Sequence, residues 1–435
     1  MPRASSSGES TPYTARMGMP SHRLRPMTGR DPSERGRASS TLELLFDLTV
    51  VIGLGTAAGQ LAHYLAEGHA TVAVIGFLMS AFAVVWAWMN WSWFASAYDT
   101  DDWAFRLLTL VQMVGALILS LGVPAVFSSF ESGGQIDNRT MVSGYVVMRV
   151  PMIIQWLRAA RSDPAHRGIC LVYAQTLAAA QTGWVIVAIA PLTFWPSLLL
   201  ALALASTELL GPILLSRRHG GTPWHPHHIA ERYGLLIIIA LGEGLIGTMA
   251  TLSVLFDASG WSVDFVVVGL AGVGLTFGIW WAYFLFPSGA LLEHFRSRSR
   301  LWGNGHIPLF IAVVAVGGGL HLAAYAIDGR SHLGPVPTLL AIAIPLAAYA
   351  VLIYALFGSL TRALTRRHLW QLAASLAVAL LSVVLVALGS PLSVGLVVLS
   401  FVPWVTVIAQ ERDARRKELS SDALALGASP HHRRV

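Results

Sequence analysis

Charged residues are scarce in this 435-residue chain: Asp, Glu, Lys and Arg make up 12% of it, about half of the roughly 25% typical of soluble domains. Hydrophobic residues make up 55%. Apolar windows of about twenty residues, the length needed to cross ~30 Å of hydrocarbon, recur from residue 44 to residue 409. The sequence therefore predicts an all-α integral membrane protein.

Cysteine is nearly absent as well, since the chain holds only Cys170. A disulfide framework and a cysteine-based zinc site are thereby excluded. No GxSxG elbow, HExxH motif or P-loop occurs in the sequence, so an enzyme is not favoured, and neither a cofactor nor a metal is predicted. The net charge of +6 does not indicate nucleic-acid binding, because the basic residues are scattered among the ends of the apolar segments.

The apolar segments number twelve. They lie near residues 44–65, 70–94, 106–127, 140–158, 168–189, 196–215, 229–250, 263–286, 305–327, 335–357, 368–388 and 391–409. If the amino terminus is cytoplasmic, 26 of the 29 basic residues fall on the cytoplasmic side. This asymmetry follows the positive-inside rule, and it predicts that both termini are cytoplasmic.

The ends of the chain differ in composition from the apolar part. Residues 1–40 are rich in Ser, Arg, Gly and Pro, and they predict a disordered basic cytoplasmic arm. Residues 411–435 begin with "ERDARRKEL" and predict a basic cytoplasmic tail at the membrane surface. The membrane part divides into a first half, 41–220, and a second half, 221–410.

The two halves share sequence in the same order. "FDLTVVIGLG" from Phe46 aligns with "YGLLIIIALG" from Tyr233, and Trp91 of "WSWF" aligns with Trp281 of "WAYF". The offset drifts only from 187 to 190 between these matches. We therefore expect a six-plus-six internal repeat. An even number of spans in each half would relate the halves by an axis along the membrane normal, a parallel repeat.

Three charged residues lie deep in the predicted spans, namely Arg149, Glu208 and Glu243. Glu243 lies twelve residues beyond Glu231, or ~18 Å along a helix, which places its carboxylate near the middle of the bilayer. An isolated carboxylate there needs a partner, and Arg149 is the natural one, with Glu208 as its competitor. The group is either a structural ion pair or the lining of a polar cavity in which one carboxylate exchanges a proton or cation.

Two motifs carry a family resemblance. "LELLFDLTVVIGLGTAAGQL" from Leu42 and "HIAERYGLLIIIALGEGLI" from His228 resemble the hallmarks of the bacterial low temperature requirement A (LtrA) family, and "WWAYF" and "HIP" support the likeness. The resemblance covers about residues 40–405. It implies a multi-pass protein of the bacterial cytoplasmic membrane and a link to growth in the cold, but no reaction. Leu285 stands where members commonly carry an aspartate, so that residue's role does not transfer.

The motif residues with ionisable side chains are Glu43, Asp47, His228, Glu231 and Arg232. Asp47 lies one turn inside the first span, where it could reach an arginine of the preceding arm. Glu231 suits the first turn of its helix, where the helix dipole favours an acid.

Five histidines near span ends complete the candidates. His225, His227 and His228 suit titratable side chains at the membrane interface better than a metal site. His306 and His321, at opposite ends of the ninth span, are either packing residues or members of a proton path.

These observations favour a transporter or permease, with a proton-linked mechanism as one form of it, for an unidentified small molecule or ion. The alternatives are a non-transporting structural or accessory protein that supports growth under cold or envelope stress, and a membrane enzyme that acts on lipid. Membrane lipids are the expected partners.

Overall fold

The computed structural model of the chain describes residues 24–132 and 136–427, and over these residues the protein is all-helical. Eleven helical segments of this part are long and apolar enough to cross a membrane. They are Thr41–Ala66, Ala70–Tyr98, Trp103–Ser132, Arg139–Ser162, Arg167–Ile189, Pro226–Ser259, Val263–His294, Arg296–Ile327, Pro335–Thr361, Arg366–Ala387 and Leu392–Asp413.

The remaining predicted span, 196–215, is helical too. It corresponds to helix α7 (Phe194–His219), in which the described apolar stretch, Trp195–Gly211, is shorter than the other eleven. All twelve segments predicted from the sequence overlap helices of the structure. The exact number of membrane crossings therefore stays a prediction.

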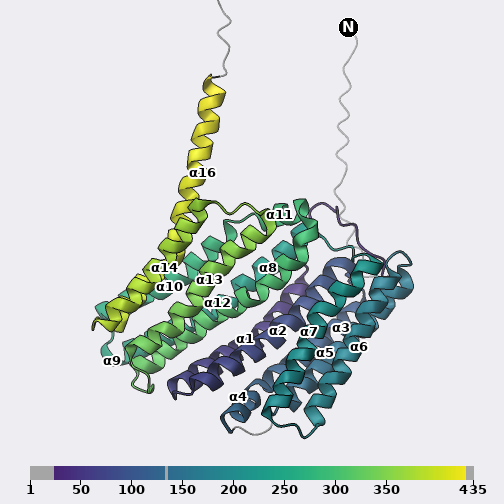
Figure 1. Cartoon of the computed structure of the whole chain (residues 1–435), viewed down its shortest axis with the longest axis horizontal. Helices are drawn as coiled ribbons and strands as arrows, with labels where there is room; N and C mark the ends of the chain where they lie inside the picture. Colours follow the sequence, from purple (N-terminus) through teal and green to yellow (C-terminus); the bar gives the residue numbers. More distant parts are fainter. Residues whose placement is uncertain (1–23, 133–135, 428–435) are drawn as a thin grey trace, which may run out of the picture.

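The helices form two groups that lie side by side (Figure 1). The first group holds α1 (Thr41–Ala66), α2 (Ala70–Tyr98), α3 (Trp103–Leu121), α4 (Val123–Ser132), α5 (Arg139–Ser162), α6 (Arg167–Ile189) and α7. The second holds α8 (Pro226–Ala240), α9 (Gly242–Ser259), α10 (Val263–Phe284), α11 (Ser288–His294), η1 (Arg296–Arg298), α12 (Ser299–Ile327), α13 (Pro335–Thr361), α14 (Arg366–Ala387), α15 (Leu392–Ser400) and α16 (Val402–Gly427).

The groups meet along α1, which packs against both α12 and α8. Small residues allow close approach of helices, as is common in membrane bundles. Between α3 and α5, for example, a Cβ atom on Gly144 would lie 2.2 Å from the backbone nitrogen of Leu119. Helix α12 is the most enclosed of the candidate spans, with 83% of its most apolar window buried. It lies between the two groups, where it packs against α9 and α13 of the second group and α1 of the first.

The helix order supports only part of the expected repeat. In each group the third predicted span packs against the fourth and the fifth against the sixth. The aligned tryptophans differ, however. Trp91 stacks on Phe46 of α1 with ring centroids 4.0 Å apart, whereas Trp281 contacts Trp404 of α16. The aligned tryptophans therefore give the repeat no support, and it stays a prediction.

Part of the amino-terminal arm is packed against the bundle, which corrects the expectation of disorder for that part. Met27 is fully buried, and the backbone N–H groups of Arg25 and Gly29 donate to Asp102 and Asp163. Buried backbone groups need such partners, and here the acids at the helix ends provide them. Residues 1–23 lie outside the described part of the chain.

The first part of the carboxyl-terminal segment is helical, and its expected place at the membrane surface stays a prediction. Helix α16 continues to Gly427, and Figure 1 shows its later turns projecting beyond the bundle. Residues 428–435 lie outside the described part.

Candidate functional site

The two motifs meet at the contact between α1 and α8, where they form two buried ion pairs. Asp47 accepts from both terminal nitrogens of Arg232, at 2.8 Å and 2.5 Å. Trp88 of α2 donates its indole N–H to Asp47 at 2.6 Å. Asp47 and Arg232 are 0% exposed. A bidentate pair of this kind is strong and fixes the relative position of the two helices.

One helical turn away lies the second pair. The Nε2 atom of His228 is 3.2 Å from a carboxylate oxygen of Glu43. Glu43 also accepts from the backbone N–H of Ser40 at 2.7 Å and so forms a capping box at the start of α1. Residues four apart lie on the same helix face. The motif residues therefore form a two-step ladder of opposite charges between the helices, called here the motif ladder: Glu43, Asp47, His228 and Arg232.

The contacts of the motif residues correct two expectations, those for Asp47 and Glu231. Asp47 binds Arg232 and not an arginine of the arm. His228 is fully buried and pairs with Glu43, and its level in the membrane stays a prediction. Glu231 is not in the first turn, because α8 begins earlier, at Pro226; its carboxylate accepts from the backbone N–H of Ser39 at 3.2 Å.

The other two histidines of this stretch have separate partners. His225 caps α8 by accepting from the backbone N–H of His228, and its Nε2 lies 2.8 Å from the carbonyl oxygen of Glu34. His227 forms an exposed pair with Glu293 at 3.0 Å. The three side chains thus point to different partners and do not converge on one ion.

A second buried cluster surrounds Glu208 of α7. Arg149 of α5 forms an ion pair with it at 2.8 Å. The carboxylate also accepts from Trp86 of α2 at 2.5 Å, from Tyr145 of α5 at 3.0 Å and from Trp184 of α6 at 2.8 Å. Four donors on three helices therefore hold one acid. Here this set is called the Glu208 cluster: Trp86, Tyr145, Arg149, Trp184 and Glu208.

The expected pair of Arg149 and Glu243 is wrong. Both residues are buried as predicted, but Arg149 binds Glu208, the competitor. Arg149 lies on α5, which packs with α3 and α6, whereas Glu243 lies on α9, which packs with α12 and α10. Depth in a helix predicted that each charge is buried. It did not give the neighbouring helix, which decides the partner.

Glu243 lies between α1, α9 and α12 and is 7% exposed. A Cβ atom on Gly55 would lie 2.5 Å from the carboxylate of Glu243. A Cβ atom on Gly317 would lie 2.7 Å from the Cβ atom of Glu243. The two glycines therefore make the space that Glu243 occupies. Among the described residues no hydrogen-bond or ion-pair partner is found for this carboxylate. Burying a charge without a partner costs free energy, so Glu243 needs a proton, a water molecule or a cation.

A cavity of about 420 Å³ adjoins the Glu208 cluster. Its walls come mainly from α2, α5 and α7, and most of the side chains are apolar. The polar lining residues are Asn138, Tyr145, Ser206 and Glu208, together with the indoles of Trp86 and Trp184. Asn138 is 7% exposed, and its side-chain oxygen has no hydrogen-bond partner. This volume suits a small molecule with an apolar body.

A second cavity of about 110 Å³ follows the first along the same helices. On α2 the first cavity is lined from Leu78 to Trp86 and the second from Trp86 to Trp93. Leu209 of α7 also lines both. The second cavity includes Asn304 near the start of α12, whereas the first reaches Ile311. The two cavities are therefore adjacent along α2, and Trp86 and Leu209 line both.

The two histidines of α12 are not adjacent. His306 is buried, with Tyr283 at 3.1 Å from its Nε2 and the carbonyl oxygen of Trp302 at 2.8 Å from its Nδ1. These contacts agree with a packing role. His321 lies fifteen residues further, about 22 Å along the helix, and its Nε2 is buried without a partner. A proton path through both residues stays a prediction.

Two features of the site were missed from the sequence. The motif ladder had a signal, because one motif carries two acids four residues apart and the other carries two bases four residues apart. The indole donors had a weaker one. Trp86, Trp88 and Trp184 lie within apolar segments, where a buried indole N–H usually needs a partner, and each donates to a buried acid.

The arrangement defines a class: the chain has the architecture of a polytopic helical membrane protein with charge pairs buried among its helices. The family model described as "Bacterial low temperature requirement A protein (LtrA)" matches residues 38–402. The chain therefore belongs to the LtrA family.

A protein of Rhizobium meliloti (strain 1021), described as uncharacterized, is 25% identical over 305 residues. The match covers 65% of this chain and 69% of that protein. No solved structure matches the chain.

Proposed function

We propose that the protein is a transporter or permease whose solute passes between the two cavities, with the Glu208 cluster at the constriction. The observation that carries the proposal is the shared wall: Trp86 and Leu209 line both cavities, and Trp86 donates to Glu208. The position of the wall is thus tied to the charge state of one buried acid.

Proton linkage follows from that connection. When Glu208 is ionised, it holds Trp86 and Arg149 together. Protonation removes the negative charge, weakens these charge-assisted hydrogen bonds and frees the indole to move. A solute that enters the larger cavity then gains access to the smaller one. The same acid therefore couples proton binding to passage.

The cavity lining supports a solute class. Its surface is largely apolar, and the unpartnered oxygen of Asn138 is free to accept a hydrogen bond from a solute. Arg149 neutralises Glu208, so the cavity wall carries little net charge. A neutral solute with an apolar body and one donor group suits these surroundings.

The expected topology and location belong to the same proposal. With α7 as a twelfth span, both termini lie in the cytoplasm of a bacterium, and the smaller cavity faces that side because it includes Gly221 and Thr222. The two groups of helices are then the halves of a parallel repeat.

Cysteine accessibility tests the constriction. In a Cys170→Ser background, which removes the one native thiol, single cysteines replace Ala205 in the larger cavity and Asn304 in the smaller one. In right-side-out and inside-out vesicles, a membrane-impermeant thiol reagent is expected to label the two positions from opposite sides. A cysteine in place of the fully buried Ala323 is the control and should stay unlabelled.

The gate is tested in the same vesicles. Trp86→Ala should allow labelling of both positions from either side. The labelling rates are corrected for the ionisation of a free thiol. The corrected rates should vary with pH in the parent protein and should not vary with pH in Glu208→Gln. Labelling of both positions from one side with Trp86 intact would contradict the proposal.

One observation favours the alternative of a structural or accessory protein. The motif ladder joins α1 to α8 through buried pairs. A buried pair that holds two helices in position needs no further function. Under this alternative the protein supports growth in the cold or under envelope stress without moving a solute. Growth in the cold should then tolerate a bulky residue in the cavity, such as Ala205→Phe, whereas a transporter should lose function.

A further inference from the structure

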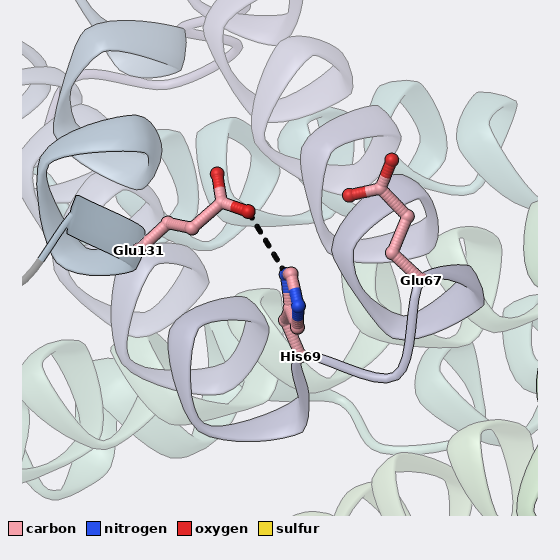
Figure 2. Close-up of side chains that lie close together, drawn as sticks. All are labelled: Glu67, His69 and Glu131. Atoms are coloured by element: carbon pink, nitrogen blue, oxygen red, sulfur yellow. Dashed lines mark ion pairs between the residues drawn. The ribbon is translucent and has the colours of Figure 1, made fainter.

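Three side chains of types that bind metal ions lie close together at the connection between α1 and α2. Glu67 and His69 belong to this connection, and Glu131 comes from the end of α4. One ligand atom of each lies within 4.8 Å of the others. Figure 2 shows His69 between the two carboxylates, with its ion pair to Glu131 marked.

The distances fit a tetrahedral ion. Zinc binds histidine nitrogen and carboxylate oxygen at about 2.0–2.2 Å, so neighbouring ligand atoms of a tetrahedron lie roughly 3.4 Å apart. The Nδ1 atom of His69 is 3.2 Å from Glu131. His63, one turn before Glu67, has its Nε2 atom 3.6 Å from the Glu67 carboxylate. These two edges are thus close to the required length. His63 contacts only Glu67 and lies outside the group of three, so its ring must turn toward the other ligands to complete a four-ligand shell.

The backbone fixes these side chains in place. Gly68 adopts a φ of +85°, and its N–H bonds the carbonyl of Leu65 at 2.9 Å, while the N–H of His69 bonds that of Tyr64 at 2.8 Å. A left-handed residue of this kind ends α1 in a tight turn. The ring of Tyr64 stacks on Phe127 of α4 at 5.5 Å, which holds the end of α4 beside the turn.

We propose that His63, Glu67, His69 and Glu131 form a zinc-binding site that ties the α1–α2 connection to α4. Two carboxylates balance the charge of the ion, and two neutral imidazoles complete its shell. The four side chains are 44–51% exposed, so an aqueous ion reaches them. As ion pairs alone they would contribute little, because exposed pairs are worth about 0–1 kcal/mol. The site is independent of the Glu208 cluster.

Zinc binding to the full chain tests the site. The protein is purified in detergent with a tag that contains no histidine, treated with a chelator, and titrated with zinc chloride. We expect one zinc ion per chain, and X-ray absorption should give four nitrogen or oxygen neighbours at about 2.0–2.2 Å. His69→Ala and Glu131→Gln should each weaken binding by more than about 100-fold, beyond the effect typical of losing a second-shell partner.

A matched control comes from another exposed pair. His227 and Glu293 lie 3.0 Å apart and are similarly exposed. Among the described residues, however, they do not belong to a group of three close ligand side chains. His227→Ala should therefore leave zinc affinity unchanged. Equal affinity of the parent and both site variants, or a shell made only of water oxygens, would overturn the proposal. Because all four side chains are at the surface, the variants should fold, which circular dichroism and gel filtration can check.

Discussion

The motif ladder and the Glu208 cluster are both buried sets of opposite charges, but they differ in what surrounds them. Asp47 and Arg232 are 0% exposed and lie against Trp88 and Trp91, with the guanidinium carbon 5.9 Å and 5.4 Å from the rings. Glu208 instead lines a cavity of about 420 Å³. Burial of a charge pair therefore does not by itself indicate function; an adjoining space for a solute is the feature that distinguishes the two.

They also differ in how the acid is satisfied. Asp47 depends on Arg232 and one indole donor. Glu208 has three donors besides Arg149. When its base is removed, a buried carboxylate with several neutral donors keeps most of its hydrogen bonds. A carboxylate with one neutral donor loses most of them. This difference predicts which cluster fixes the fold and which one can change its bonding during a functional cycle.

The largest effect is expected at the motif ladder. Arg232→Met leaves Asp47 buried with Trp88 as its remaining donor, and loss of one partner of a buried pair typically costs roughly 3 to 5 kcal/mol. The variant should unfold at a clearly lower temperature or fail to accumulate. The measurement is the thermal unfolding midpoint of purified protein in detergent.

A second variant separates lost charge pairing from lost packing. Asp47→Leu combined with Arg232→Met removes both charges and keeps apolar volume, so it should regain much of the lost stability. If the double variant is as unstable as the single one, packing by the arginine and not the ion pair holds α1 to α8.

A smaller effect is expected at the Glu208 cluster. Arg149→Met leaves the carboxylate with its three remaining donors and a cavity that water can enter. The loss should be roughly 1 to 3 kcal/mol, typical of one buried hydrogen-bonding group. Chemical unfolding of both single variants under the same conditions gives the comparison. Equal losses for Arg149→Met and Arg232→Met would remove the distinction between the clusters.

The sequence predicted the all-helical architecture and the positions of the helices, because long apolar windows are a one-dimensional signal. It also placed Arg149, Glu208 and Glu243 correctly in buried positions. It failed on the partner of Arg149, since which helices touch depends on packing that no single window contains. The order of residues 24–40 was missed for a similar reason: Met27 is buried by contacts with distant helix ends, although its own segment looks disordered.

Glu243 extends the comparison to a third buried acid, for which the described residues provide no basic partner. A Cβ on Gly317 would meet the backbone carbonyl carbon and Cβ of Glu243 at 2.7 Å, and these atoms cannot move without shifting α9. A Cβ on Gly55 would meet only the carboxylate end, at 2.5 Å. Gly317→Ala should therefore destabilise the protein by about 1–3 kcal/mol, as overpacking does, and Gly55→Ala by less.

The same pair of variants tests the role of Glu243. If its carboxylate binds a proton during transport, Gly55→Ala should fold nearly normally and still impair growth in the cold, because the added methyl displaces the carboxylate. Glu243→Gln removes the carboxylate itself and should show the same defect. Normal growth of both variants would assign Glu243 no part in the function.

A further effect is expected outside the apolar part of the spans, at Asp102, which precedes α3. Burial by itself raises the pKa of this carboxyl group, but hydrogen bonds from Arg158 and from the backbone N–H groups of Phe105 and Arg25 lower its pKa to about 2. The ordinary value in an unfolded chain is about 3.9. The ionised group therefore stabilises the fold above about pH 4, and this contribution disappears as the pH falls through about 2.

Asp102→Asn should accordingly lower the unfolding temperature at pH 7, and its difference from the parent should shrink between about pH 4 and pH 2. Asp101→Asn is the matched control. Asp101 forms an ion pair with Arg106 at 2.7 Å, but both side chains are about half exposed, and such pairs contribute little. Thermal unfolding across this pH range measures both variants. A difference for Asp102→Asn that persists unchanged down to pH 2 would show that the amide disturbs the α3 cap and the docked arm by its shape, and not by the missing charge.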